Sequence, residues 1–200
     1  MKNGKKITDQ ATLVIPTLVS RIFDPPVIVT LLTFIGVVKS ELSHRGLMTF
    51  AILIPFFLGL PLGYFLWSLK TRQVSNWDVT NRKERLVPLA ALLGFLTVDL
   101  FIISFFDNPF LLNMFFVYFL WTIGFLGITF FWKISGHTGI TTLAAGLLTQ
   151  WFGWEFSLLF LCVPLVAWAR IVRSDHTIYQ VVAGVLYSLA ILAIFSSWVY

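Results

Sequence analysis

Long apolar stretches separated by short polar links constrain this chain more than any other feature of its sequence. An α-helix needs about 17 to 25 apolar residues to cross a hydrocarbon layer of roughly 30 Å. Four stretches clearly reach this length: Leu47–Leu69, Leu86–Phe106, Phe110–Trp132 and Thr177–Val199. A water-soluble domain of this size cannot hide them all from solvent. The sequence therefore predicts an all-α integral membrane protein.

Three further apolar stretches are shorter. Two of them, Gly139–Phe152 and Glu155–Ala169, are separated by only two residues, which predicts a tight hairpin. The third begins with a Pro-Pro pair, which suits the first turn of a helix, and runs over Pro25–Val38. We therefore expect a helical bundle of about six to seven transmembrane helices over residues 25–200.

The first 24 residues have a different pattern from the rest of the chain. Residues 7–23 carry apolar side chains at helical spacing, and three lysines precede them. This pattern favours an amphipathic helix that lies in the membrane interface behind a basic N-terminus, with an extension of the first span as the alternative. The predicted organisation is thus an interfacial segment over residues 1–24 and a polytopic membrane domain over residues 25–200.

Composition excludes several classes of protein. The chain has 58% hydrophobic and only 12% charged residues, with a mean hydropathy of +0.88. A soluble domain has roughly 25% charged residues, so a water-soluble enzyme and a disordered chain are both excluded. Nucleic-acid binding is excluded with them, although the formal net charge is +5. The single cysteine, Cys162, allows no disulfide within the chain.

The positive charges predict an orientation in the membrane. Because successive spans cross in opposite directions, twelve of the 14 lysines and arginines fall on one face, and only Lys39 and Arg45 fall on the other. The positive-inside rule makes the first face cytoplasmic.

The same face carries three polar segments: Asn76–Arg85, Lys133–His137 and Arg170–Gln180. Two spans separate each segment from the next, so an even number of crossings returns all three to one side of the membrane. We therefore expect His137, His176 and several arginines to meet at the ends of packed helices.

These residue types suit the binding and transfer of a phosphoryl group. An arginine fork holds two phosphate oxygens at once and keeps its charge at any working pH. Ser135 and Gly136 precede a predicted helix, whose free N–H groups form an anion site. Two histidines can divide the chemistry, one attacking phosphorus and the other protonating the leaving oxygen. This scheme needs no metal and no cofactor.

Gln180 lies four residues after His176, which places both side chains on one helical face. Its side chain can hold one imidazole nitrogen and aim the other. A neutral amide stabilises a positive imidazolium less than a carboxylate does, so we expect Gln180 to orient the ring and to raise its basicity only slightly.

Two short patterns in these segments resemble the type 2 phosphatidic acid phosphatase superfamily of membrane lipid phosphatases. The patterns are Ser135-Gly136-His137 and Arg170-x5-His176-x3-Gln180. The family's corresponding motifs are Pro-Ser-Gly-His and Ser-Arg-x5-His-x3-Asp. The stretch from His176 to Val181 is most similar to the dolichyl-diphosphate phosphatase branch, which also has glutamine at this position.

The chain departs from the family pattern at several positions. Ile134 stands where the second motif has proline, and Ala169 stands where the third has serine. The first motif, Lys-x6-Arg-Pro, is matched poorly: seven positions before Arg85 lies Asp78, and Leu86 follows Arg85.

The resemblance implies a six-helix catalytic core and a metal-independent hydrolysis of a lipid phosphate or isoprenoid diphosphate through a phosphohistidine. It makes His176 the nucleophile, His137 the general acid and Gln180 the residue that orients His176. The phosphate ligands that it implies are Arg85, Arg170, Ser135 and Gly136, with Arg82 or Lys83 in place of the missing lysine.

Two other functions stay open at this stage. One is a non-catalytic lipid-phosphate-binding relative or small transporter, because the first motif lacks its lysine and Gln180 replaces an aspartate. The other is a magnesium-dependent prenyl or alcohol phosphotransferase, for which Asp78 and Glu84 are the only carboxylates near Arg82 and Arg85.

Overall fold

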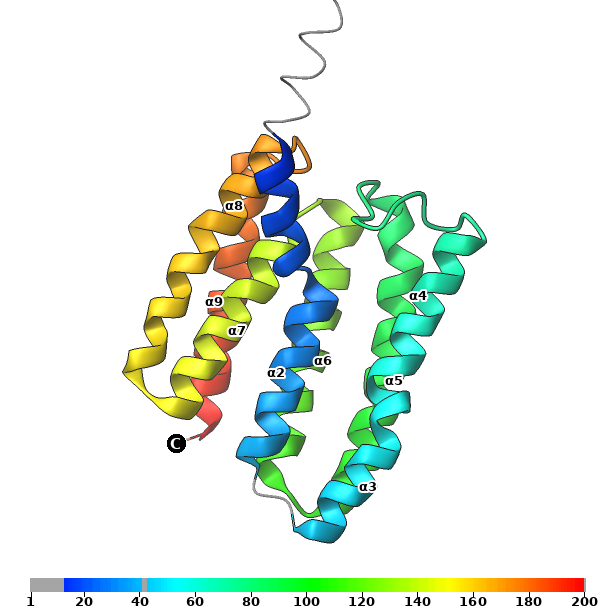
Figure 1. The fold of residues 1–200 in the computed structure, drawn as a ribbon, viewed down its shortest axis with the longest axis vertical. Coiled ribbons are helices and arrows are strands. Elements are labelled where there is room, and N and C mark those ends of the chain that lie inside the picture. The colour runs from blue at the N-terminus through cyan, green and yellow to red at the C-terminus, as the bar shows by residue number, and fades with distance from the viewer. Residues whose placement is uncertain (1–12, 41–42, 200) are drawn as a thin grey trace, which may run out of the picture. The chain divides into compact units, whose positions relative to one another are not determined.

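The structure is a computed structural model that describes residues 13–40 and 43–199. Within this part of the chain every regular element is a helix, and no strand occurs (Figure 1). The prediction of an all-α protein is therefore confirmed. The three lysines of the predicted basic N-terminus lie outside the described residues.

Five helices in the described part of the chain are long and apolar enough to cross a membrane. They are Leu13–Lys39, Lys83–Phe106, Pro109–Phe131, Trp154–Val172 and Ile178–Phe195. The first of them is interrupted at residues 23 and 24, between a helix over residues 13–22 and helix α2 (Pro25–Lys39).

The predicted number of six to seven spans is not confirmed. Helix α7 (Gly136–Phe152) has 17 residues, and at 1.5 Å per residue it extends about 26 Å, less than the roughly 30 Å of a hydrocarbon core. The apolar stretch expected over Leu47–Leu69 is divided into three elements. These are α3 (His44–Ile54), the π-helical turn η1 (Pro55–Gly59) and α4 (Leu60–Lys70). Pro55 begins the π-helical turn, because a proline removes one hydrogen bond of a regular helix.

The chain forms two compact units, and each is described by itself. Unit 1 comprises Met1–Val29 and Ile134–Tyr200, and unit 2 comprises Thr30–Lys133. Helix α2 therefore begins in unit 1 and ends in unit 2.

Unit 1 contains the predicted hairpin. After α7 the chain turns at Gly153, whose φ of 111° is open to glycine at little cost. It continues through the 3-10 helix η4 (Trp154–Leu161) into α8 (Cys162–Val172), and a short turn leads to α9 (Ile178–Val199). Figure 1 shows α7, α8 and α9 side by side, from yellow to red.

Helix α9 approaches α7 closely through two glycines. A Cβ atom at Gly184 would lie 2.5 Å from the carbonyl oxygen of Ser135 and 2.8 Å from Oγ1 of Thr138. A Cβ atom at Gly146 would instead meet the side chain of Leu192. The start of α9 is therefore packed against the backbone at the start of α7, and the two helices run in parallel.

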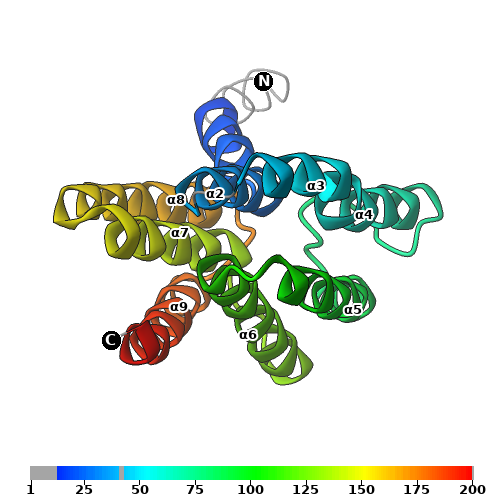
Figure 2. The same cartoon turned by 90° about the horizontal axis from the view of Figure 1, so that it is seen from below.

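Unit 2 is a second set of packed helices. It contains α3, η1 and α4, which were introduced above. They are followed by the 3-10 helix η2 (Lys83–Arg85), α5 (Leu86–Ile103), the 3-10 helix η3 (Ser104–Phe106) and α6 (Pro109–Phe131). Asn108 caps α6, because its side-chain oxygen accepts a hydrogen bond from the N–H of Leu111 at 3.0 Å. Figure 2 shows α5 beside α6 in the view from below. The inner side of α6 is aromatic, with Trp121 stacked on Phe125.

Candidate active site

Arg170 connects the two predicted histidines of unit 1. Its Nη1 lies 3.5 Å from Nε2 of His137, and its backbone oxygen accepts a hydrogen bond from the N–H of His176 at 3.3 Å. Arg170 is 0% exposed, and each histidine is 6% exposed. The segments that contain the two motifs therefore meet in space, although more than 30 residues separate His137 from Arg170 in the sequence.

Ser135 and Gly136 lie at the start of α7, as the sequence predicts, but the two residues have different roles. Ser135 is the N-cap of α7, and its side-chain oxygen accepts from the N–H of Thr138 at 3.4 Å. Its own N–H donates to the carbonyl oxygen of Gln180 at 3.0 Å. The backbone amide of Ser135 is thus already used, whereas Gly136 is the first residue of α7, a position whose N–H has no partner within the helix.

A second hydrogen bond fixes α9 to the same turn. Oγ1 of Thr138 donates to the carbonyl oxygen of Val181 at 3.1 Å. Because Gly184 carries no side chain, α9 can approach closely enough for this bond to form. Gly184 was not among the residues predicted from the sequence. The only signal for it was an isolated glycine inside an otherwise apolar helix.

Gln180 holds His176 as the four-residue spacing predicts. The distance between Nδ1 of His176 and Oε1 of Gln180 is 3.1 Å. An amide oxygen only accepts hydrogen bonds, so this contact favours a proton on Nδ1, and the neutral ring in that tautomer carries its lone pair on Nε2.

Gln180 also caps helix α9. Its Oε1 accepts from the N–H of Thr177 at 3.2 Å, and its own N–H donates to Oγ1 of Thr177 at 3.4 Å. This reciprocal pair is a capping box, and its Thr-x-x-Gln signature is readable in the sequence. The ring of His176 is therefore held by a residue that is itself fixed at the start of a helix.

Two arginines share one carboxylate beside His176. Asp175 Oδ2 lies 3.2 Å from Nη2 of Arg170 and 3.0 Å from Nε of Arg173. The chain reaches this arrangement through Ser174, which adopts a left-handed conformation with φ of 58°. The ion pair compensates the burial of Arg170, because a buried guanidinium needs an opposite charge.

Asp24 is a member of the site that the sequence analysis missed. Its Oδ1 lies 3.4 Å from Nε2 of His137, and it is 5% exposed. It lies between the helix over residues 13–22 and α2, and its backbone oxygen accepts from the N–H of Ile28 at 3.0 Å. From the sequence, an aspartate directly before a Pro-Pro pair indicates only a helix cap.

Arg82, Lys83 and Arg85 belong to unit 2 and make their described contacts there. Nη1 of Arg82 donates to the carbonyl oxygen of Phe130 at 2.8 Å, which ties the segment before α5 to the end of α6. Nε of Arg85 donates to the carbonyl oxygen of Val79 at 2.7 Å. Val79 has a φ of 42°, a strained value for a β-branched residue.

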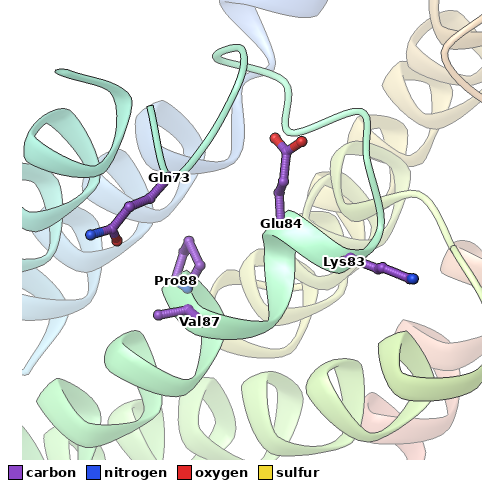
Figure 3. A pocket seen from close by; sticks show the side chains of 5 residues that line it. All are labelled: Gln73, Lys83, Glu84, Val87 and Pro88. Atoms are coloured by element: carbon purple, nitrogen blue, oxygen red, sulfur yellow. The ribbon is translucent and has the colours of Figure 1, made fainter. Parts of the chain in front are cut away.

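Lys83 lines a pocket of about 370 Å³ in unit 2 with Gln73, Glu84, Val87 and Pro88. Figure 3 shows that Lys83 extends away from Gln73, across the turn that opens α5. Glu84 accepts hydrogen bonds from the N–H of Ser75 and from the side chain of Asn81. This carboxylate therefore organises the loop before α5.

In unit 1 a buried arginine contacts a buried histidine at the start of α7 through its side chain, and its backbone bonds to the N–H of a second buried histidine. Comparisons of the chain with protein-family models, curated proteins and solved structures give no match. Within residues 13–40 and 43–199, no group of three or more His, Cys, Asp and Glu side chains is arranged to hold a metal ion.

Proposed function

We propose that this protein is an integral membrane phosphatase that hydrolyses a lipid phosphate or isoprenoid diphosphate, in the manner of the type 2 phosphatidic acid phosphatase superfamily. The observation that carries the proposal is the position of Arg170, with its side chain 3.5 Å from His137 and its backbone bonded to His176. The buried guanidinium of Arg170 thus contacts the imidazole of His137, and the backbone of Arg170 joins the turn that carries His176.

The first step uses His176 as the nucleophile. With the proton of the imidazole on Nδ1 and directed to Gln180, the lone pair of Nε2 attacks phosphorus. The bond between phosphorus and the leaving oxygen breaks, and that oxygen takes a proton from His137. Arg170 and the N–H of Gly136 bind the phosphoryl oxygens, whose negative charge increases in the transition state.

The second step releases phosphate. Neutral His137 takes a proton from a water molecule, which attacks phosphorus and breaks its bond to Nε2 of His176. Inorganic phosphate leaves, and both histidines return to their starting states. Gln180 keeps the ring in the same orientation through both steps.

The apolar helices support a substrate with a lipid tail. Four apolar side chains of the helix over residues 13–22, Val14, Ile15, Leu18 and Ile22, are each more than half exposed, beside the exposed Thr17 and Arg21. Surfaces of this kind are stable in a hydrocarbon or interfacial environment, where a lipid substrate also resides. The positively charged site then binds the headgroup.

The direct test is turnover by the purified protein in detergent. We expect release of phosphate from phosphatidic acid or farnesyl diphosphate, loss of activity in His176→Ala and His137→Ala, and normal activity in His44→Ala, which changes the third histidine of the chain. Brief incubation with a ³²P-labelled substrate should label His176. Phosphate release that is unchanged in both site variants would overturn the proposal.

The same assay separates the alternatives. Activity that disappears on chelation of divalent cations would indicate a magnesium-dependent phosphotransferase. Lipid-phosphate binding without turnover would indicate a non-catalytic relative.

A further inference from the structure

Asp24 and Arg170 approach the same nitrogen atom of His137 from different elements. Oδ1 of Asp24 lies 3.4 Å from Nε2, and Nη1 of Arg170 lies 3.5 Å from it. Asp24 lies in the break between the helix over residues 13–22 and α2, whereas Arg170 lies on α8. All three residues belong to unit 1.

The two contacts favour opposite protonation states. A guanidinium only donates hydrogen bonds, so Arg170 favours a bare lone pair on Nε2. A carboxylate only accepts them, so Asp24 favours a proton on Nε2. A single ring nitrogen cannot satisfy both partners at once. Without Asp24, the positive charge of Arg170 would keep His137 neutral at the atom that must deliver a proton.

We propose that Asp24 is the positioning residue that holds the proton on Nε2 of His137 and thereby makes His137 the general acid. This inference deepens the proposed function and rests on it. At His176 the neutral Gln180 supplies orientation without charge, whereas at His137 a carboxylate supplies the charge. As the leaving oxygen separates from phosphorus, it takes the Nε2 proton, and Asp24 then faces neutral His137.

Two other charged residues of unit 1 contact the partners of His137. Arg21 contacts the other oxygen of Asp24 at 3.8 Å, and Asp175 lies behind Arg170. The other titratable groups on the elements packed against α7 are Arg173 and His176 near the turn between α8 and α9, Glu155 on η4, Cys162 on α8, and Tyr179 and Tyr187 on α9. Glu155 follows Gly153 at the opposite end of α7.

The first test compares two leaving groups. An alkyl phosphate needs a proton on its leaving oxygen, whereas p-nitrophenyl phosphate does not. We expect Asp24→Asn to lower kcat on the alkyl substrate by about 100-fold, within the range for general acid catalysis, and to change kcat on the nitrophenyl substrate less than about twofold. Asp24→Glu should restore the alkyl activity. An equal loss on both substrates would mean that Asp24 is only structural and would overturn the inference.

The pH profile gives a second readout. A general acid works only while it is protonated, and removal of a neighbouring negative charge disfavours the protonated imidazole. The alkaline limb of the pH profile of kcat on the alkyl substrate should therefore move to lower pH in Asp24→Asn. Glu155→Gln removes a carboxylate from the far end of α7 and should leave the profile in place. An unmoved limb in Asp24→Asn contradicts the inference.

A spectroscopic test needs no enzymatic activity. The chain has three histidines, so ¹⁵N-labelled imidazole gives three sets of signals, which His44→Gln and His176→Gln assign. We expect Nε2 of His137 to carry a proton in the unmodified protein, and the signals of His44 to be the same in Asp24→Asn. A bare Nε2 in the unmodified protein overturns the inference even if the protein folds and hydrolyses its substrate. Failure of the unmodified protein to hydrolyse any phosphate would instead overturn the proposed function.

Discussion

Oε1 of Gln180 lies 3.1 Å from Nδ1 of His176 and also accepts the backbone N–H of Thr177 at 3.2 Å. One amide oxygen therefore caps helix α9 and sets the tautomer of the proposed nucleophile. A neutral side chain performs both tasks, so no negative charge lies directly behind the ring of His176 at this contact.

Replacement of Gln180 should affect both tasks. In Gln180→Ala the ring loses its acceptor and the helix loses one of the two bonds of its capping box, so we expect kcat to fall about 10- to 100-fold, as for other residues that orient a histidine, and the free energy of unfolding to fall by about 1 kcal/mol. Gln180→Glu keeps both acceptors and adds a charge that stabilises an N-phosphorylated imidazolium.

Rapid quench with a ³²P-labelled substrate is the measurement for this pair of variants. The phosphoenzyme should accumulate more in Gln180→Glu than in the unmodified protein, because its breakdown becomes slower relative to its formation. An unchanged phosphoenzyme level in Gln180→Glu, together with full activity of Gln180→Ala, would contradict the orienting role.

Gly184 should tolerate no side chain. In Gly184→Ala the new methyl group would meet the backbone oxygen of Ser135, so α9 must move away from the start of α7. We expect a loss of about 1 to 3 kcal/mol in unfolding free energy and a loss of activity, because the bond from Ser135 N–H to Gln180 is broken.

Gly146→Ala is the matched control for this variant. Its methyl group would meet only the flexible side chain of Leu192, and alanine favours a helix over glycine by about 1 kcal/mol. Thermal unfolding in detergent should show Gly146→Ala close to the unmodified protein. Equal destabilisation by the two substitutions would show that the backbone contact at Gly184 is no more restrictive than the side-chain contact at Gly146.

Arg170 should not be replaceable by lysine. Its guanidinium contacts His137 through Nη1 and Asp175 through Nη2, and a single ammonium cannot reach both with the same geometry. Loss of one charge-assisted hydrogen bond costs about 1.5 to 3 kcal/mol, which corresponds to about a 10- to 100-fold lower kcat/KM in Arg170→Lys.

Arg173→Lys is the comparison for Arg170→Lys, since Arg173 also contacts Asp175 but lies closer to solvent. We expect kcat/KM of Arg173→Lys to stay within about threefold of the unmodified protein, as for a partly exposed ion pair. A similar loss in both variants would assign the effect to the shared carboxylate of Asp175 and not to phosphate binding by Arg170.

The positive-inside rule predicts that the proposed site faces the cytoplasm. Single cysteines can report it in a Cys162→Ser background, because Cys162 is the only native cysteine. In intact cells a membrane-impermeant maleimide should label Glu155→Cys and should label Gln73→Cys and Ser174→Cys only after the membrane is opened. The reverse pattern would place the proposed site on the outer face.

The local features of the site were readable in the sequence. The start of α7 directly after Ser135, the turn at Gly153 and the spacing between His176 and Gln180 each depend on residues within one helical turn. Short-range geometry is fixed by the helix itself, so a sequence pattern is sufficient to predict it. The number of spans was less accessible, because hydropathy does not reveal the π-helical turn at Pro55 or the exact end of α7.

The sequence alone determined that the chain is helical and apolar, where its polar segments fall, and which histidines and arginines are candidates for chemistry. The contact of Asp24 with His137 becomes visible only in the folded chain, as does the identity of Arg170 as an arginine beside that histidine, because these contacts join residues far apart in the chain. Only the tertiary structure also decided that Gly184 must have no side chain. The physical reason is common to all three: such contacts depend on how helices pack, and packing is set by side-chain shape across elements and not by periodicity along any one of them.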